Sequence, residues 1–335
     1  MGVRMLGGMA LLLLTAACGF AQDADGLMEG TTVRGFVDAS YFAEMNSQSN
    51  TFGLDQAEVD LERTWNEYLV VRADLQWVSD GAGGFSTGLE QGYLQFQLPA
   101  APVLTWTFGK FNAPMGFEML DPHEMYQYSH AYVFDYGLPT NLTGAMLGYA
   151  SEVGFSVSGW VVNGWDANVE DNKNFTGGGR LQYDHEDMFS VGVSSIIGVE
   201  SWAGNNMVSV YDFDATITAV EKLTVGLEFN FGSIDLEPEA STWMGYLVMI
   251  HYDFNEWAGA TLRYDSLDDT DGSRFMTGGE TRNAVTIAPT FVLGGGMGAL
   301  VEYKYEMSDL DAWLDSDGQP TDTNNTIAFE MTYTF

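Results

Sequence analysis

The feature that most constrains this chain is an alternation of apolar and polar residues with a period of two, repeated along almost its whole length. The C-terminal segment shows it clearly, with Ile327, Phe329, Met331, Tyr333 and Phe335 on one parity and Thr, Ala and Glu residues on the other. Successive side chains of a β-strand point to opposite faces, so each such segment is a predicted strand with one apolar face.

Sixteen segments carry this pattern. They are predicted near residues 31–44, 51–64, 66–78, 87–98, 102–112, 141–151, 153–165, 175–184, 187–199, 207–217, 222–232, 241–253, 256–268, 281–293, 296–308 and 323–335. The joins between them alternate in length: seven are only a few residues long, and eight are longer and rich in Asp, Asn, Gly and Ser. This alternation puts both ends of the chain on the short-turn side, which is typical of an outer-membrane barrel.

Two other architectures, a bundle of membrane helices and a soluble sandwich, fit the sequence less well than the barrel. No segment after residue 21 is apolar for long enough to form a membrane helix. A soluble sandwich is also built from alternating strands, but it does not call for aromatic residues at strand ends. In this chain six aromatic residues lie near predicted strand ends, and we interpret them as girdles at the two lipid interfaces: Trp106, Trp160, Trp165, Trp243, Trp257 and Tyr333. The expected fold is all-β, a transmembrane antiparallel β-barrel of about sixteen strands.

The composition excludes further classes. The chain has 335 residues with 12 Lys and Arg against 47 Asp and Glu, and 46% of it is hydrophobic. A disordered acidic chain would lack that apolar content. A net charge of −35 argues against nucleic acid as a partner, because phosphate binding needs clustered cations.

The first 21 residues have the features of a secretory signal peptide: Arg4, an apolar run over 5–14, and small residues before Gln22. Lipid attachment at Cys18 is the alternative. We therefore expect a signal peptide at 1–21, a short lead at 22–30, and one barrel domain at 31–335. The expected mature chain has no cysteine and so no disulfide.

Four stretches in the first half are more specific. They read LDQAEVDLER at 54–63, GKFNAPMGFE at 109–118, YSHAYVFDYGLPTNLTG at 128–144 and VVNGWD at 161–166. With them the chain resembles the OmpL-like β-barrel porin family. The resemblance implies an outer-membrane channel of a Gram-negative-type envelope, and it names no solute.

The strand count also indicates a channel, because side chains no longer fill a barrel of about sixteen strands. The longest join, 113–140, is a candidate constriction loop by analogy with general porins. Its acids are Glu118, Asp121, Glu124 and Asp135; the basic residues on the predicted inward parity are Arg34, Arg72, Arg180, Arg263 and Lys304. An acidic loop that faces a basic wall would create a transverse electric field across the pore.

The alternative for these charges is a solvated loop, with the basic groups paired to wall acids such as Asp74, Asp265, Glu302 and Glu306. Lys110 shares the outward parity of Phe108, so it is expected to face lipid unless a bulge intervenes. His123 and His130 lie in the same join, where they could contact solute or pack the loop.

The leading functional hypothesis is passive diffusion of small hydrophilic solutes, with a preference for cations because of the acidic charge. The alternative is a structural or surface-binding barrel with a closed lumen and long acidic loops that bind a partner or Ca²⁺, for which 265–274 and 309–322 have acids at suggestive spacing. No motif for catalysis, a cofactor or a metal was found. Expected partners are solutes and ions, outer-membrane lipid, the barrel-assembly machinery through the strand ending in Phe335, and two further copies in a homotrimer.

Overall fold

The computed structural model describes residues 30–66 and 68–335. The expected signal peptide (1–21) and, apart from Gly30, the expected lead (22–30) lie outside the described residues.

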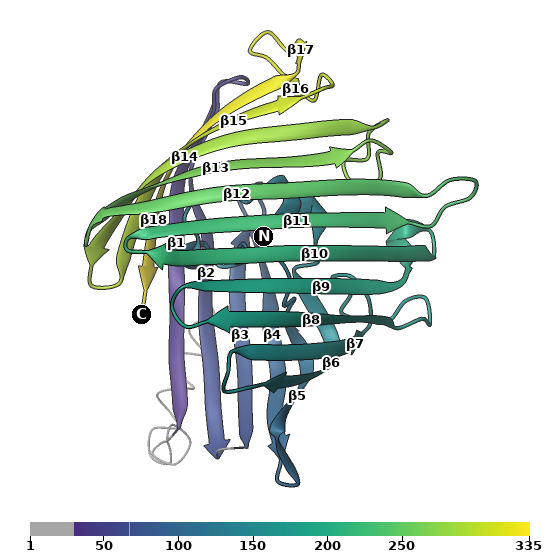
Figure 1. The fold of residues 1–335 in the computed structure, drawn as a ribbon. Helices are drawn as coiled ribbons and strands as arrows, with labels where there is room; N and C mark the ends of the chain where they lie inside the picture. Colours follow the sequence, from purple (N-terminus) through teal and green to yellow (C-terminus); the bar gives the residue numbers. More distant parts are fainter. Residues whose placement is uncertain (1–29, 67) are drawn as a thin grey trace, which may run out of the picture.

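The described residues form one closed barrel of sixteen antiparallel strands, in which each strand pairs with its neighbours in sequence (Figure 1). The barrel strands are β1 (Thr31–Glu44), β2 (Ser49–Asn66), β3 (Leu69–Ser79), β4 (Phe85–Leu98), β5 (Ala101–Asn112), β6 (Asn141–Ala150), β7 (Phe155–Val162), β8 (Thr176–His185), β9 (Phe189–Glu200), β10 (Asn206–Val220), β11 (Leu223–Ile234), β12 (Ser241–Asn255), β13 (Ala258–Asp269), β14 (Glu280–Gly294), β15 (Met297–Ser308) and β18 (Thr323–Thr334). The sixteen predicted segments and the all-β barrel are confirmed.

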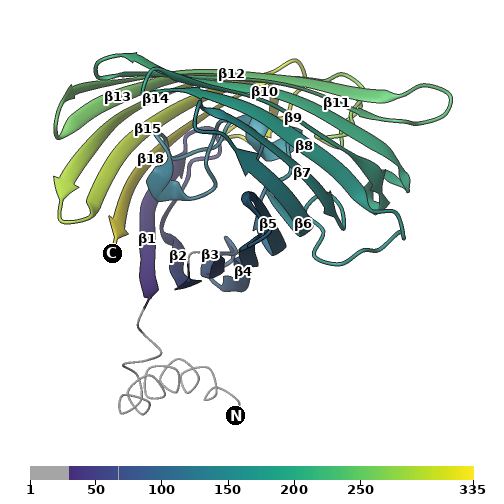
Figure 2. The same ribbon diagram turned by 60° about the horizontal axis from the view of Figure 1, so that its bottom comes forward.

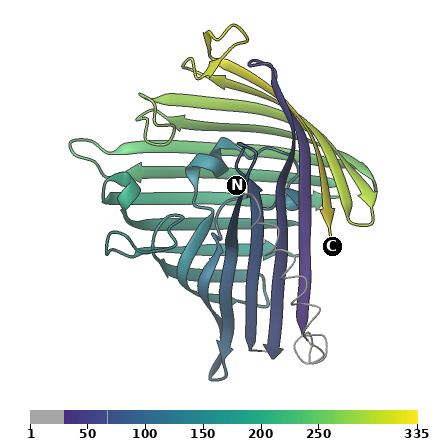
Figure 3. The same ribbon diagram turned by 180° about the vertical axis from the view of Figure 1, so that it is seen from behind.

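The barrel closes where the first strand meets the last. β1 and β18 pair from Phe36 opposite Thr334 to Glu44 opposite Thr326. The backbone of Phe335 continues the ladder, since its N–H donates to the carbonyl of Gly35 at 3.0 Å and its carbonyl accepts from the N–H of Gly35 at 3.2 Å. Figure 3 shows this seam from behind, with β18 lying along β1. Closure leaves no strand edge unpaired, as a barrel in lipid requires.

The two faces of the strands separate as the alternation predicts. On β13, Leu262 is half exposed on the outside, whereas Arg263 and Asp265 are fully buried. On β15, Val301 and Tyr303 point outward and Glu302 is buried. The outer surface is therefore apolar and suited to hydrocarbon, and the charged residues face the interior.

The joins carry the remaining elements. The long join after β5 holds η1 (Pro122–Glu124) and α3 (Tyr132–Gly137), a later one holds η2 (Ser201–Ala203), and the last holds a small hairpin of β16 (Trp313–Leu314) and β17 (Pro320–Thr321). Figure 2 shows the strands curving around the segment that carries η1 and α3. We call residues 113–140 the inward loop. Among the described residues, no helix is long and apolar enough to cross a membrane.

The aromatic girdle prediction was wrong for Trp160 and Trp243, and the partly buried Trp165 packs with Trp243 in the same interior cluster. Trp160 on β7 and Trp243 on β12 are only 3% and 1% exposed, so they cannot face lipid. Each has inward parity on its strand and packs in the cluster that the inward loop completes. Trp257 and Tyr333, by contrast, are exposed on the outer surface.

A bulge on β4 changes which residues face the interior. Asp74 of β3 pairs with Gln91 and Leu75 pairs with Leu89, so Glu90 is an extra residue and is buried together with Gln91. Lys110 keeps outward parity, and its Nζ donates to the carbonyl oxygen of Leu89 at 3.0 Å. The bulge therefore places one more carboxylate in the lumen and gives Lys110 a hydrogen-bond acceptor.

Candidate functional site in the barrel lumen

The inner wall of β11 and β12 is shaped to receive the inward loop. A Cβ at Gly226 would lie 2.1 Å from the ring of Phe117, and one at Gly245 would lie 2.9 Å from Val133. Leu247 and Met249 complete an apolar cluster with Val133. These inward positions are apolar or glycine because they face the loop rather than water, which removes apolar surface from solvent.

Wall carboxylates hold the loop by accepting hydrogen bonds from its backbone. The N–H of Gly116 donates to Asp212 at 3.2 Å, and the N–H of Phe117 donates to Glu228 at 2.7 Å. The same arrangement recurs further along the loop, where Ser129 N–H donates to Glu302 at 3.1 Å and Tyr132 N–H donates to Asp265 at 3.0 Å. A hydrogen bond contributes about 0.5–1.5 kcal/mol, so these four together attach this side of the loop to the wall.

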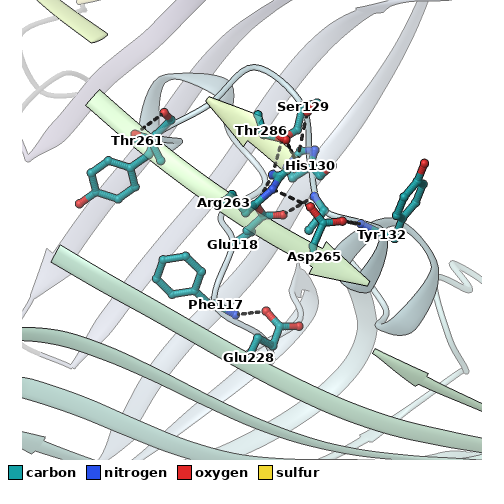
Figure 4. Close-up of polar contacts among 12 residues, drawn as sticks. Phe117, Glu118, Ser129, His130, Tyr132, Glu228, Thr261, Arg263, Asp265 and Thr286 are labelled. Atoms are coloured by element: carbon teal, nitrogen blue, oxygen red, sulfur yellow. Dashed lines mark hydrogen bonds and ion pairs between the residues drawn. The ribbon is translucent and has the colours of Figure 1, made fainter. Parts of the chain in front are cut away.

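Arg263 is the centre of this attachment (Figure 4). Its guanidinium is fully buried and forms ion pairs with Glu118 of the loop at 2.7 Å and with Asp265 of its own strand at 2.9 Å. It also donates to the backbone carbonyls of Ser129 at 2.6 Å and His130 at 3.1 Å. One side chain thus joins two separate parts of the inward loop to β13.

The lumen stays open on the other side of the loop. A cavity of about 580 Å³ lies between the loop and the wall of β4 to β8. Its lining includes Gln95 and Thr107 from the wall, Glu118 and Met119 from the loop, and Arg180 from β8. The wall contributes polar side chains such as Gln95 and Thr107, which water can contact.

The four predicted loop acids occupy different environments. Glu118 contacts Arg263, and its second oxygen accepts from the N–H of Ala131 at 2.8 Å. Asp121 lies against the wall carboxylates Glu58 and Glu90, and burial together with the charge of Glu90 raises the pKa of Asp121 to about 8. Glu124 is exposed and lines a second cavity of about 230 Å³, and Asp135 is exposed on α3.

The predicted basic residues are mostly paired with wall acids. The ion pairs are Arg72 with Asp74 at 2.9 Å, Arg180 with Asp214 at 2.5 Å, Arg263 with Asp265, and Lys304 with Glu306 at 3.1 Å. Arg34 is exposed near the start of β1. Of the predicted loop acids, Glu118 is the one that forms an ion pair with a predicted wall base among the described residues. Pairing within the wall and pairing across to the loop therefore occur together.

Several wall acids that lie against the loop were missed by sequence reasoning. Asp212, Glu228 and Glu58 have inward parity on their strands, and inspecting every inward carboxylate would have found them. Glu90 could not be found this way, because simple alternation places it on the parity of Leu94, which faces outward.

The loop histidines pack against aromatic rings. His130 stacks on Phe134 with ring centroids 4.1 Å apart and its Nε2 lies 2.9 Å from the carbonyl of Met119. His123 lies 4.7 Å from the ring of Phe36, and burial lowers its pKa. Both therefore have a packing role.

In each of the two suspected calcium loops, one acid accepts more than one hydrogen bond from the backbone of its own loop. Asp269 accepts from the N–H groups of Ser273, Arg274 and Phe275, and Asp315 accepts from Asp317 and Gln319. In the described part of the chain, no three acids of 309–322 converge as metal ligands would.

Solved structures with the same fold are outer-membrane proteins. OmpT of Vibrio cholerae, in a form lacking loop L8, has 12% identity and a TM-score of 0.68 over 91% of this chain and 100% of that chain. The channel DcaP of Acinetobacter baumannii has 10% identity and 0.67 over 91% and 97%, and an anion-selective porin from Comamonas acidovorans has 9% and 0.67 over 91% and 99%. At these identities the likeness is one of fold. The comparison with curated proteins finds no match.

The sequence itself matches the family described as beta-barrel porin-2, OmpL-like, over residues 30–335. The match covers every strand of the barrel, and the family and fold are those of a channel in the bacterial outer membrane rather than of an enzyme. The chain therefore belongs to the OmpL-like beta-barrel porin family.

Proposed function

We propose that this porin lets small hydrophilic solutes diffuse passively through the space between the inward loop and the β4–β8 wall, with a preference for cations. The observation that carries the proposal is the charge of the interior. Among the described residues, the fully buried Asp, Glu, Lys and Arg side chains are acids with two exceptions, Arg263 and Lys304, and both of these are paired with carboxylates. An excess of carboxylates around a narrow aqueous path attracts cations.

The fold does not decide the sign of the selectivity. The porin from Comamonas acidovorans that shares this fold is described as anion-selective. The charges inside the barrel must therefore set the preference, and most of the buried charged side chains of this chain are acids.

Conductance of the purified protein in planar bilayers tests the proposal. We expect stepwise openings and, in a KCl gradient, a reversal potential on the cation-selective side. Glu124→Lys, which changes an exposed loop acid beside a cavity, should move the reversal potential toward anions. Asp317→Lys is the matched control, because it makes the same charge change in the turn of the β16–β17 hairpin at the rim and should leave selectivity nearly unchanged (Figure 1).

A silent bilayer would contradict the proposal and favour the alternative, a barrel with a closed lumen whose loops bind a partner. Unchanged selectivity in Glu124→Lys would remove that residue from the ion path.

Two further expectations concern partners. OmpT has been solved in a trimer form, and we propose the same assembly here, to be tested by the sedimentation mass in detergent.

We also propose that the barrel-assembly machinery recognises the terminal strand, whose outward residues include Phe329 and Phe335. Deleting Phe335 should then slow insertion in vivo without changing conductance of the folded channel.

A further inference from the structure

A cluster of carboxylates lies where the inward loop meets the β2–β4 wall. Glu58 of β2, Glu90 of the β4 bulge and Asp121 of the loop each present an oxygen within 4.8 Å of the others. Glu58 belongs to a second such group with Asp60 and Asp74. Asp74 is paired with Arg72 and accepts from Gln91 at 2.7 Å, whereas one oxygen of Asp60 is buried without a partner beside the first group.

The environment of Glu58 is an independent observation that points to a bound cation or proton in this cluster. Its side chain is 1% exposed, and within the described residues neither of its carboxylate oxygens has a hydrogen-bond partner. Glu90 Oε2 and Asp121 Oδ1 are buried without a partner as well, although Glu90 Oε1 accepts from Asn112 at 3.0 Å. No ion pair in the described chain joins Lys or Arg to Glu58, Glu90 or Asp121. Leaving buried carboxylates unpaired is costly, so they are expected to hold a cation or protons.

The geometry suits one cation in particular. Ca²⁺ takes about six to eight oxygen ligands at about 2.3–2.6 Å in a flexible geometry. Mg²⁺ binds at about 2.0–2.1 Å in a stricter octahedron and keeps several waters. A group of three carboxylates from three different segments is better matched to the larger and more tolerant ion, because most of its ligands then come from the protein.

We propose that Glu58, Glu90 and Asp121 bind a calcium ion that ties the inward loop to the β2–β4 wall. Two ligands come from the wall and one from the loop, so the ion bridges them. It replaces carboxylate repulsion with attraction where the loop meets the β2–β4 wall. The width of the space beside the loop then depends on the ion.

Calorimetric titration of the EDTA-stripped protein in detergent tests this directly. The readout is binding heat rather than conduction, so the result is independent of the proposed channel activity. We expect about one Ca²⁺ per chain, with Mg²⁺ binding more weakly. No binding up to about 10 mM Ca²⁺, which exceeds the Kd of weak extracellular calcium sites, would overturn the proposal and assign the cluster to shared protons.

Variants locate the site. Glu58→Gln and Asp121→Asn should each weaken Ca²⁺ binding at least about tenfold, because even the residues that support metal ligands are worth 10–100-fold. Asp121 is in the loop, so its variant keeps the strand sequence if Glu58→Gln fails to fold. Asp317→Asn, an exposed acid of the last loop, is the matched control and should bind as the wild type does. Loss of binding in Asp317→Asn with retention in Asp121→Asn would also overturn the proposal.

Discussion

The inward loop meets the barrel wall in opposite ways on its two sides. Toward β10–β15 apolar contacts are accompanied by contacts that join an acid to a donor, as Glu228 accepts from Phe117 and Glu118 pairs with Arg263. Toward β2–β4 carboxylate meets carboxylate, with Asp121 against Glu58 and Glu90. The first side is held by groups that the chain supplies itself, and the second needs a proton or a cation from solution. Changes on the two sides should therefore respond differently to ions.

The largest effect on stability is expected on the side of the loop that faces β10–β15. Arg263→Met leaves Glu118 and Asp265 buried without their cation, and removing one partner of a buried ion pair costs about 3–5 kcal/mol. The free energy of unfolding, from guanidinium titration in detergent, should fall by that amount, and single-channel conductance should rise as the loop is released. Arg34→Met, at an exposed site, is the control and should stay within about 0.5 kcal/mol. Equal effects of the two changes would refute the central role of Arg263.

A steric change on the same side should have the next largest effect. Gly226→Val places side-chain atoms where the Phe117 ring lies, and overpacking of this kind costs about 1–3 kcal/mol. Gly88→Val is the matched control, because nothing lies within 4 Å of a Cβ at that strand position. Guanidinium titration of both variants should show a loss of stability for Gly226→Val alone. A loss of the same size in both variants would mean that replacing any strand glycine lowers stability, and that contact with the inward loop is not the cause.

A smaller, pH-dependent effect is expected on the unpaired side. Because the pKa of Asp121 is about 8 in the folded protein and near 3.8 in an ordinary environment, the folded state keeps a proton that the unfolded chain releases. Stability therefore falls as the pH rises from about 4 to about 8. In EDTA, the wild type should lose more stability over this range than Asp121→Asn. Excess Ca²⁺ should reduce the difference; identical pH profiles of the two proteins would contradict it.

The smallest effect is expected away from the loop. Lys110→Met removes the single hydrogen bond to Leu89 and should cost about 1 kcal/mol or less. Conductance should not change, because the side chain has outward parity. A change in ion selectivity would show that Lys110 reaches the lumen.

The alternation predicted the fold closely and the interior only in part. Strands, joins and the outward position of residues such as Leu262 follow from period two, because one face must contact hydrocarbon. The assignment of Trp243 to a lipid girdle failed because an apolar residue at a strand end can face either lipid or a loop packed inside. Parity along one strand does not distinguish these environments unless the register and the packed loop are known.

The sequence by itself determined a barrel of about sixteen antiparallel strands, since local periodicity and turn lengths specify the order of the strands and which face is apolar. Only the tertiary structure decided how the interior is arranged. A bulge turns Glu90 inward against its parity. The loop that follows β5 brings Asp121 close to Glu58 on β2. Such contacts join residues distant in sequence, and no short-range pattern encodes the distance between them.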